Sequence, residues 1–100
     1  MTARGIEHVR TEIDAVDREI VHLIARRQGF VVEAGRLKTD RAAVRAPDRV
    51  GQVVDKVRAL AGEAGADPDV VERTYRAMID AFIDLELTVH AHHTTDQNDD

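Results

Sequence analysis

The chain has 100 residues, a length typical of one domain, and a chain this short buries only a modest share of its surface when it folds alone. Its net charge of −5 argues against general nucleic-acid binding, and the lack of cysteine excludes disulfides and thiolate metal sites. The first residues lack an apolar signal core, and no apolar run reaches membrane-spanning length. We therefore expect a cytoplasmic protein that binds neither nucleic acid nor membrane.

A regular series of apolar residues predicts a long first helix over residues 6–38. Its seam, with positions three or four residues apart, comprises Ile6, Val9, Ile13, Val16, Ile20, Leu23, Arg27, Phe30, Ala34 and Leu37. Such a helix is about 50 Å long at roughly 1.5 Å per residue, which is too long to bury its seam within a domain of this size. A second copy of the chain is the simplest partner. Gly29 and Gly35, which weaken a helix, are candidate points of close backbone approach.

A second, shorter helix is expected after a break at residues 39–46. Pro47 suits its first turn, and Gly62 and Gly65 end it. Its apolar face comprises Val50, Val53, Val54, Val57, Leu60 and Ala61.

A third helix follows, with Asp67 as its N-cap candidate and Pro68 at its first position, and we expect it to end near His92. Its buried face comprises Val71, Tyr75, Met78, Ile79, Phe82, Leu85 and Val89. The fold class is therefore all-α, with three helices in the order long, short, long and no strand. The helical domain covers residues 1–93, and residues 94–100 form a disordered polar and acidic tail.

Arg27 is out of place, because it occupies a position of the first seam where an apolar residue is expected. A guanidinium group in an apolar setting needs a partner. One interpretation is an internal ion pair with Glu33, Glu86 or Asp14. The other is an anion site, since arginine offers a planar fork to a carboxylate.

Lys38 lies eleven residues after Arg27, which is three helical turns and about 20° of rotation. The two cations therefore share one face, roughly 16 Å apart at the backbone, and their long side chains can converge on one small ligand. A lysine that only complements the end of the helix dipole is the alternative.

Arg10 cannot join these cations within one helix. It lies seventeen residues before Arg27, about 25 Å away along the axis and turned by about 100°. An antiparallel partner helix can bring it to the same pocket; otherwise Arg10 is a solvated arginine. Arg49, in the first turn of the second helix, is a further candidate anion ligand or a surface charge.

Glu86 lies among apolar residues of the third helix. A carboxyl group that is desolvated there favours its neutral form and can donate a hydrogen bond, whereas the alternative is an ion pair with a nearby arginine. His90, His92 and His93 lack carboxylate partners at fixed spacing, so we expect no metal site.

The segments VRTEIDAVDREIVHLIARRQGF, GRLK, VRAPDRV and AFIDLE together resemble the all-helical (AroQ-type) chorismate mutases, over about residues 9–89. The resemblance implies an intertwined homodimer of three-helix chains with two active sites. It implies that Arg27, Arg49 and, from the other subunit, Arg10 hold the two carboxylates of chorismate. Lys38 then donates to the ether oxygen of the breaking C–O bond, and a protonated Glu86 donates to the same oxygen. No cofactor and no metal is implied. The remaining substrate-binding positions are Val44, Ala46, Val50 and Phe82.

Two positions depart from the typical mutases, because Ala46 and Val50 are apolar where those enzymes carry polar residues that bind the ring hydroxyl. The segment KTDRAAVRAPDRV is more similar to the isochorismate pyruvate lyases, a branch of the same fold that makes salicylate. Those lyases carry Gln at the position of Glu86. Chorismate mutase is therefore the first hypothesis and isochorismate pyruvate lyase the second. A mutase of 4-amino-4-deoxychorismate and a non-catalytic helical dimerisation module are further alternatives.

Overall fold

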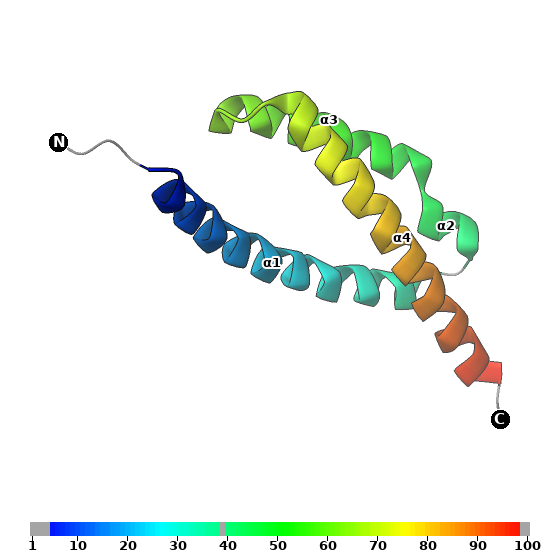
Figure 1. Cartoon of the computed structure of the whole chain (residues 1–100). Helices are drawn as coiled ribbons and strands as arrows, with labels where there is room; N and C mark the ends of the chain where they lie inside the picture. Colours follow the sequence, from blue (N-terminus) through cyan, green and yellow to red (C-terminus); the bar gives the residue numbers. More distant parts are fainter. Residues whose placement is uncertain (1–4, 39, 99–100) are drawn as a thin grey trace. The chain divides into compact units, whose positions relative to one another are not determined.

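A computed structural model describes the backbone of residues 5–38 and 40–98, and it leaves out the side chains of residues 41, 90 and 92–98. Its elements are α1 (Ile6–Leu37), α2 (Arg41–Arg45), α3 (Pro47–Ala64) and α4 (Pro68–Asn98) (Figure 1). Within these ranges there is no strand, so the all-α class and the long, short, long order are confirmed. The additional helix α2 is a single turn within the expected break. No helix in the described ranges is long and apolar enough to cross a membrane.

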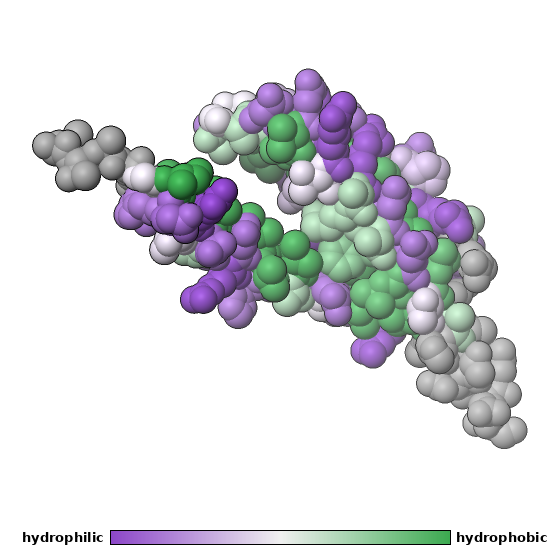
Figure 2. Space-filling view, in the orientation of Figure 1, coloured by the Kyte–Doolittle hydropathy of each residue, from purple (hydrophilic) through white to green (hydrophobic). Residues whose placement is uncertain are grey.

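The chain divides into two compact units, Met1–Phe30 and Val31–Asp100. The described residues of the first unit, 5–30, contain one helix, the larger part of α1, so the apolar seam has no second described element of its own unit to pack against. The exposed side chains of that seam are Ile6, Val9, Ile13, Val16, Ile20, Leu23 and Phe30. Phe30 is 66% exposed, and hydrophobic residues of this helix are open to view in Figure 2. The apolar pattern predicted for the seam is thus present on a helix that leaves these side chains exposed within its own unit.

The core of the second unit lies between α3 and α4, which pack against each other, with α2 packed against α4. Its buried apolar side chains are Val44 from α2, Val54, Val57 and Ala61 from α3, and Ile79 and Phe82 from α4. The spacings of three and four residues confirm the two predicted helical faces. The buried row of α3 is narrower than expected, because Leu60 is 48% exposed. With six apolar side chains among the described residues, this core is small.

The turn between α3 and α4 follows the capping chemistry expected from the sequence. Gly65 adopts a left-handed conformation with φ 80°, and its N–H donates to Gly62 O while that of Ala66 donates to Ala61 O at 2.8 Å. This pair of bonds is a Schellman motif, which satisfies the last carbonyl groups of α3. Asp67 Oδ1 then accepts from the N–H groups of Asp69 and Val70, at 2.8 and 3.3 Å. Gly65 as helix end and Asp67 as N-cap are confirmed, whereas Gly62 lies inside α3.

Helix α4 continues beyond its expected end near His92 and reaches Asn98. No glycine or proline follows Pro68 in this segment, so no residue breaks the helix where its apolar pattern stops. The placement of the end at His92 was therefore wrong. The division into a domain of residues 1–93 and a tail of residues 94–100 stays a prediction. The side chains of His90, His92 and His93 lie outside the described part of the chain.

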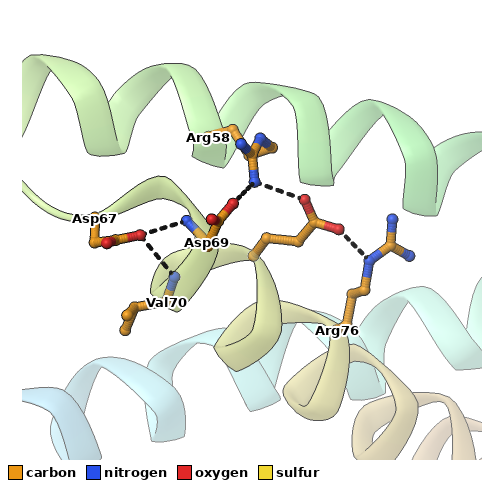
Figure 3. A network of polar contacts seen from close by, with 6 residues as sticks. Arg58, Asp67, Asp69, Val70 and Arg76 are labelled. Carbon is orange, nitrogen blue, oxygen red and sulfur yellow. Dashed lines mark hydrogen bonds and ion pairs between the residues drawn. The ribbon is translucent and has the colours of Figure 1, made fainter.

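A network of ion pairs ties α3 to the first turns of α4 (Figure 3). Arg58 of α3 donates to Asp69 Oδ1 at 2.9 Å and to Glu72 Oε1 at 2.8 Å, and Arg76 Nε donates to Glu72 Oε2 at 2.7 Å. The hydrogen bond from Arg76 is the largest cause that lowers the pKa of the Glu72 carboxyl group, although desolvation opposes it. The hydrogen bond to Asp69 does most to raise the pKa of Arg58. Both charged forms are thus favoured in the folded chain.

We expect the stability that this network contributes to the folded chain to be lost in acid. Because the pKa of Glu72 is lower in the folded than in the unfolded chain, its contribution is complete above the unfolded value of about 4.3 and is lost as the pH falls through the lower folded value. Glu72→Gln should therefore lower the melting temperature near neutral pH and reduce the further fall on acidification. Thermal unfolding at a series of pH values measures this. Glu63→Gln, which changes an exposed glutamate of α3, is the matched control. An acid transition identical in Glu72→Gln and wild type would contradict the assignment.

Candidate active site

Two of the predicted catalytic side chains, Lys38 and Glu86, are in direct contact within the second unit. Lys38 Nζ donates to Glu86 Oε1 at 2.6 Å, across 48 residues of sequence. Lys38 directly follows the last residue of α1, and its backbone N–H donates to Ala34 O at 3.1 Å, so the helical path continues through it. The side chain of Glu86 is 7% exposed and that of Lys38 28%. The ammonium group thus lies at the boundary between a buried carboxyl group and solvent.

Glu86 takes its position from the buried face of α4. It follows Ile79 and Phe82 at spacings of three and four residues, and all three are buried. A carboxyl group on such a face is costly unless it has a hydrogen-bonding partner. Lys38 supplies that partner, and no buried side-chain nitrogen or oxygen in the described part of the chain lacks a hydrogen bond. The alternative expectation for Glu86 was an ion pair with a nearby arginine, whereas the cation that contacts Glu86 in the structure is Lys38. Lys38 is accordingly more than a solvated lysine at a helix end.

The predicted substrate-binding positions of the second unit cluster around the junction of α2 and α3. Val44 is buried, Ala46 and Val50 are half-buried, and Arg49 is exposed in the first turn of α3. Ala46 closes α2 through its N–H to Ala42 O and also precedes Pro47, the first residue of α3. The conformation of Ala46 therefore sets the direction in which α3 begins, and with it the positions of Arg49 and Val50. Their roles in substrate binding stay predictions.

Ala46 adopts a left-handed conformation, with φ 32° and ψ 65°. Among the described residues that are not glycine, it alone has a positive φ. This region costs an L-residue about 1–2 kcal/mol, and proline at the next position restricts it further. Strained backbone of this kind is often found at functional sites.

We expect Ala46→Gly to stabilise the chain by about 0.5–1 kcal/mol, because the relief of strain exceeds the added entropy of the unfolded chain. Urea unfolding measures the difference. Ala59→Gly replaces an exposed alanine in the interior of α3 and should have the opposite effect, a loss of about 0.5–1 kcal/mol. If Ala46→Gly and Ala59→Gly lowered the stability equally, Ala46 would carry no backbone strain.

The other two predicted cations lie in the first unit. Arg27 is half-buried on α1, and Arg10 is exposed, with its Nη1 donating to Glu7 Oε1 at 3.2 Å. Both residues lie on one continuous helix, as the sequence predicted. Because the two units are described separately, the convergence of Arg27 and Lys38 on one ligand stays a prediction, as does the role of Arg10.

Gly35 belongs to the neighbourhood of the site, although the sequence did not place it among the site residues. It is buried in the last turns of α1, and a Cβ atom there would lie 3.1 Å from Glu86 Cγ. Its expected close approach to another backbone is confirmed, with α4 as the neighbour. Gly29 has nothing within 4 Å in the single chain. A glycine within a long helix was the available signal, but it does not reveal which residue lies opposite.

The Lys38–Glu86 contact combines two useful chemical groups. A fixed ammonium group stabilises negative charge that develops on a nearby oxygen. A buried carboxyl group, when neutral, adds a second hydrogen-bond donor. Arginines suit the carboxylates of a small anionic ligand. The Lys38–Glu86 pair can therefore stabilise negative charge that develops on an oxygen beside it.

Comparisons with known proteins agree with this chemistry. Residues 9–87 match the family model described as chorismate mutase type II. The chain is 34% identical over 79 residues to an isochorismate pyruvate lyase of Pseudomonas aeruginosa, an alignment that covers 79% of this chain and 78% of that protein. It is 32% identical over 73 residues to a T-protein of Haemophilus influenzae, which covers 72% of this chain and 19% of the T-protein. Every predicted site residue, from Arg10 to Glu86, lies within the range that matches the family.

Proposed function

Because this chain belongs to the chorismate mutase type II family, we propose that it rearranges chorismate to prephenate. The observation that carries the proposal is the contact of Lys38 with the buried Glu86, 2.6 Å between Nζ and Oε1. The two groups come from different helices and meet where the apolar face of α4 reaches the end of α1. In the proposal this pair offers a cation and a second potential donor to one small ligand.

The reaction takes place within one molecule and needs no group from outside. The ether C–O bond of chorismate breaks while a C–C bond forms between the enolpyruvyl side chain and the ring, so substrate and product have the same atoms. Negative charge grows on the ether oxygen as its bond lengthens. In our proposal Lys38 donates to that oxygen from one side and the neutral carboxyl group of Glu86 from the other. Both are fixed before the substrate reacts, which is the condition under which such donors contribute most.

The arginines supply the second part of the catalysis in this proposal. Arg27 and Arg49, with Arg10 of a second copy, hold the two carboxylates of chorismate. They thereby keep the side chain folded over the ring in a conformation close to the transition state. Restricting a flexible substrate in this way removes an entropic part of the barrier.

The same proposal includes a homodimer that covers the apolar seam of α1. In the first unit the described residues form one helix, and the large apolar side chains of its seam, from Ile6 to Phe30, are exposed. A second copy offers the same seam, and a two-fold axis lets each helix cover the other. The separation of Arg10 from Arg27 by about 25 Å along α1 supports the same partner, because only another chain can bring Arg10 to the pocket.

The second candidate is an isochorismate pyruvate lyase, which splits isochorismate into salicylate and pyruvate. Two observations favour it as the alternative. One is the similarity to the lyase of Pseudomonas aeruginosa over most of both chains. The other is the apolar pair Ala46 and Val50 at the start of α3, where a mutase is expected to bind the ring hydroxyl. The presence of Glu86, where the lyases carry Gln, favours the mutase instead.

One experiment separates the candidates. The purified protein is given chorismate or isochorismate in separate assays, and prephenate is measured against salicylate plus pyruvate. We expect prephenate from chorismate with the higher kcat/KM. A higher kcat/KM for salicylate formation would replace the mutase by the lyase, and turnover of neither substrate would refute both.

A further inference from the structure

Gly35 stands apart from the other helical glycines. Within the described part of α1 it is the one buried residue, whereas a Cβ atom at Gly29, Gly51 or Gly62 would meet nothing within 4 Å. At Gly35 that atom would lie 3.1 Å from Glu86 Cγ, 3.6 Å from Glu86 O and 3.8 Å from Glu86 Cα. All three neighbours belong to one residue. The end of α1 and the middle of α4 therefore meet at the crossing of Gly35 and Glu86.

The same crossing brings Lys38 to the carboxyl group. Lys38 lies three residues after Gly35, so the two residues share one face of the helical path. The side chain of Glu86 passes over the space that a Cβ atom of residue 35 would occupy and ends at Lys38 Nζ. A hydrogen atom in place of a side chain at Gly35 is what leaves this path open.

We propose that Gly35 is a positioning residue for the reaction, because it lets the Glu86 side chain lie across α1 and places its carboxyl group beside Lys38. This inference rests on the function proposed above. A Cβ atom at residue 35 would push Glu86 Cγ away by a few tenths of an ångström. The carboxyl group cannot absorb that shift freely, since it is buried and bound at 2.6 Å. Either the Lys38–Glu86 contact lengthens or the end of α1 moves away from α4.

A double-mutant cycle tests the proposal, with four proteins: wild type, Gly35→Ala, Glu86→Ala and the double variant. Glu86→Ala removes the Cγ atom that the new methyl group would meet, and the other two distances at Gly35 are ordinary contacts. We expect Gly35→Ala to lower kcat by about tenfold or more in the wild-type background, since small misplacements of catalytic groups are costly. KM should change less, because the arginines hold the carboxylates. In the Glu86→Ala background the same substitution should change kcat less than about twofold, which is the coupling expected for a direct contact.

The melting temperatures of the same four proteins give a readout that does not depend on turnover. Alanine improves helix propensity, so Gly35→Ala should raise the melting temperature in the Glu86→Ala background and should fail to do so in the wild-type background. Gly62→Ala, in α3 with open space around it, is the control and should raise the melting temperature equally in both.

Equal loss of kcat on adding Gly35→Ala in both backgrounds would overturn the proposal, as would a Gly35→Ala enzyme with wild-type kcat. Should Gly35→Ala fold too poorly for an assay, recovery of folding in the double variant supports the contact, and failure to recover overturns it. Should wild type turn over neither chorismate nor isochorismate, the proposed function fails by itself. The melting temperatures then decide alone whether Gly35 positions Glu86.

Discussion

Lys38→Ala should lower kcat/KM for chorismate by about 10²–10³-fold, the usual effect of removing one fixed donor from an oxygen that gains negative charge. The loss should fall mainly on kcat, because Lys38 is proposed to act on the ether oxygen in the transition state and the arginines bind the carboxylates. Steady-state kinetics at saturating chorismate measures it. Lys56→Ala, an exposed lysine of α3, is the matched control and should keep wild-type kcat.

The same substitution leaves the carboxyl group of Glu86 buried without its hydrogen-bonding partner, which is destabilising. The kinetic effect must therefore be separated from a folding effect. In the double variant Lys38→Ala, Glu86→Gln the buried group cannot ionise, so we expect most of the stability to return while the enzyme stays slow. Recovery of turnover together with stability would show that Lys38 serves the fold and not the reaction.

Glu86→Gln should change the pH dependence of kcat more than it changes the magnitude of kcat. In the proposal the carboxyl group donates a hydrogen bond, which requires its proton, so wild-type kcat should fall as the pH rises. Glutamine carries a permanent donor, and its carbonyl oxygen can still accept from Lys38 Nζ. The variant should therefore be flat in this range and faster than wild type at the alkaline end.

A pH profile of kcat for both proteins makes this comparison, with Glu63→Gln as the control for adding an amide elsewhere on the surface of the unit. Glu86→Ala should be slow at every pH, because it lacks a donor in any state. A wild-type profile that stays level, or a Glu86→Gln profile that keeps the wild-type slope, would remove the proton of Glu86 from the mechanism.

Local patterns in the sequence were sufficient to predict the three longer helices and the turn between α3 and α4. The three-and-four spacing marked the buried rows of α3 and α4, and Gly65 with Asp67 marked the turn between them, because capping depends on residues only a few positions apart. Helix α2 escaped prediction because five residues are too few to show a period. The end of α4 was misplaced because no residue breaks the helix where the apolar pattern stops.

The sequence was sufficient to single out the candidate residues of the site, but not the contacts between them. Glu86 was singled out by its apolar neighbours, and Lys38 by its spacing from Arg27 on one helical face. Spacing along the chain cannot show that two residues 48 positions apart will meet, nor that Gly35 makes room for the contact. Those facts depend on how α1 crosses α4. For Arg10, helix geometry separates it from Arg27 within one chain, and its place in a site of another copy stays a prediction.

We propose an active site shared between two copies of the chain, and a mixed dimer of two variants tests whether it is shared. Arg10→Ala and Arg27→Ala chains are produced together with two different affinity tags, and the dimer carrying both tags is purified. Each homodimer should be almost inactive on chorismate. The mixed dimer keeps one complete site, built from Arg27 of one chain and Arg10 of the other, and should show about half the wild-type activity. A mixed dimer as inactive as the two homodimers would contradict the shared site.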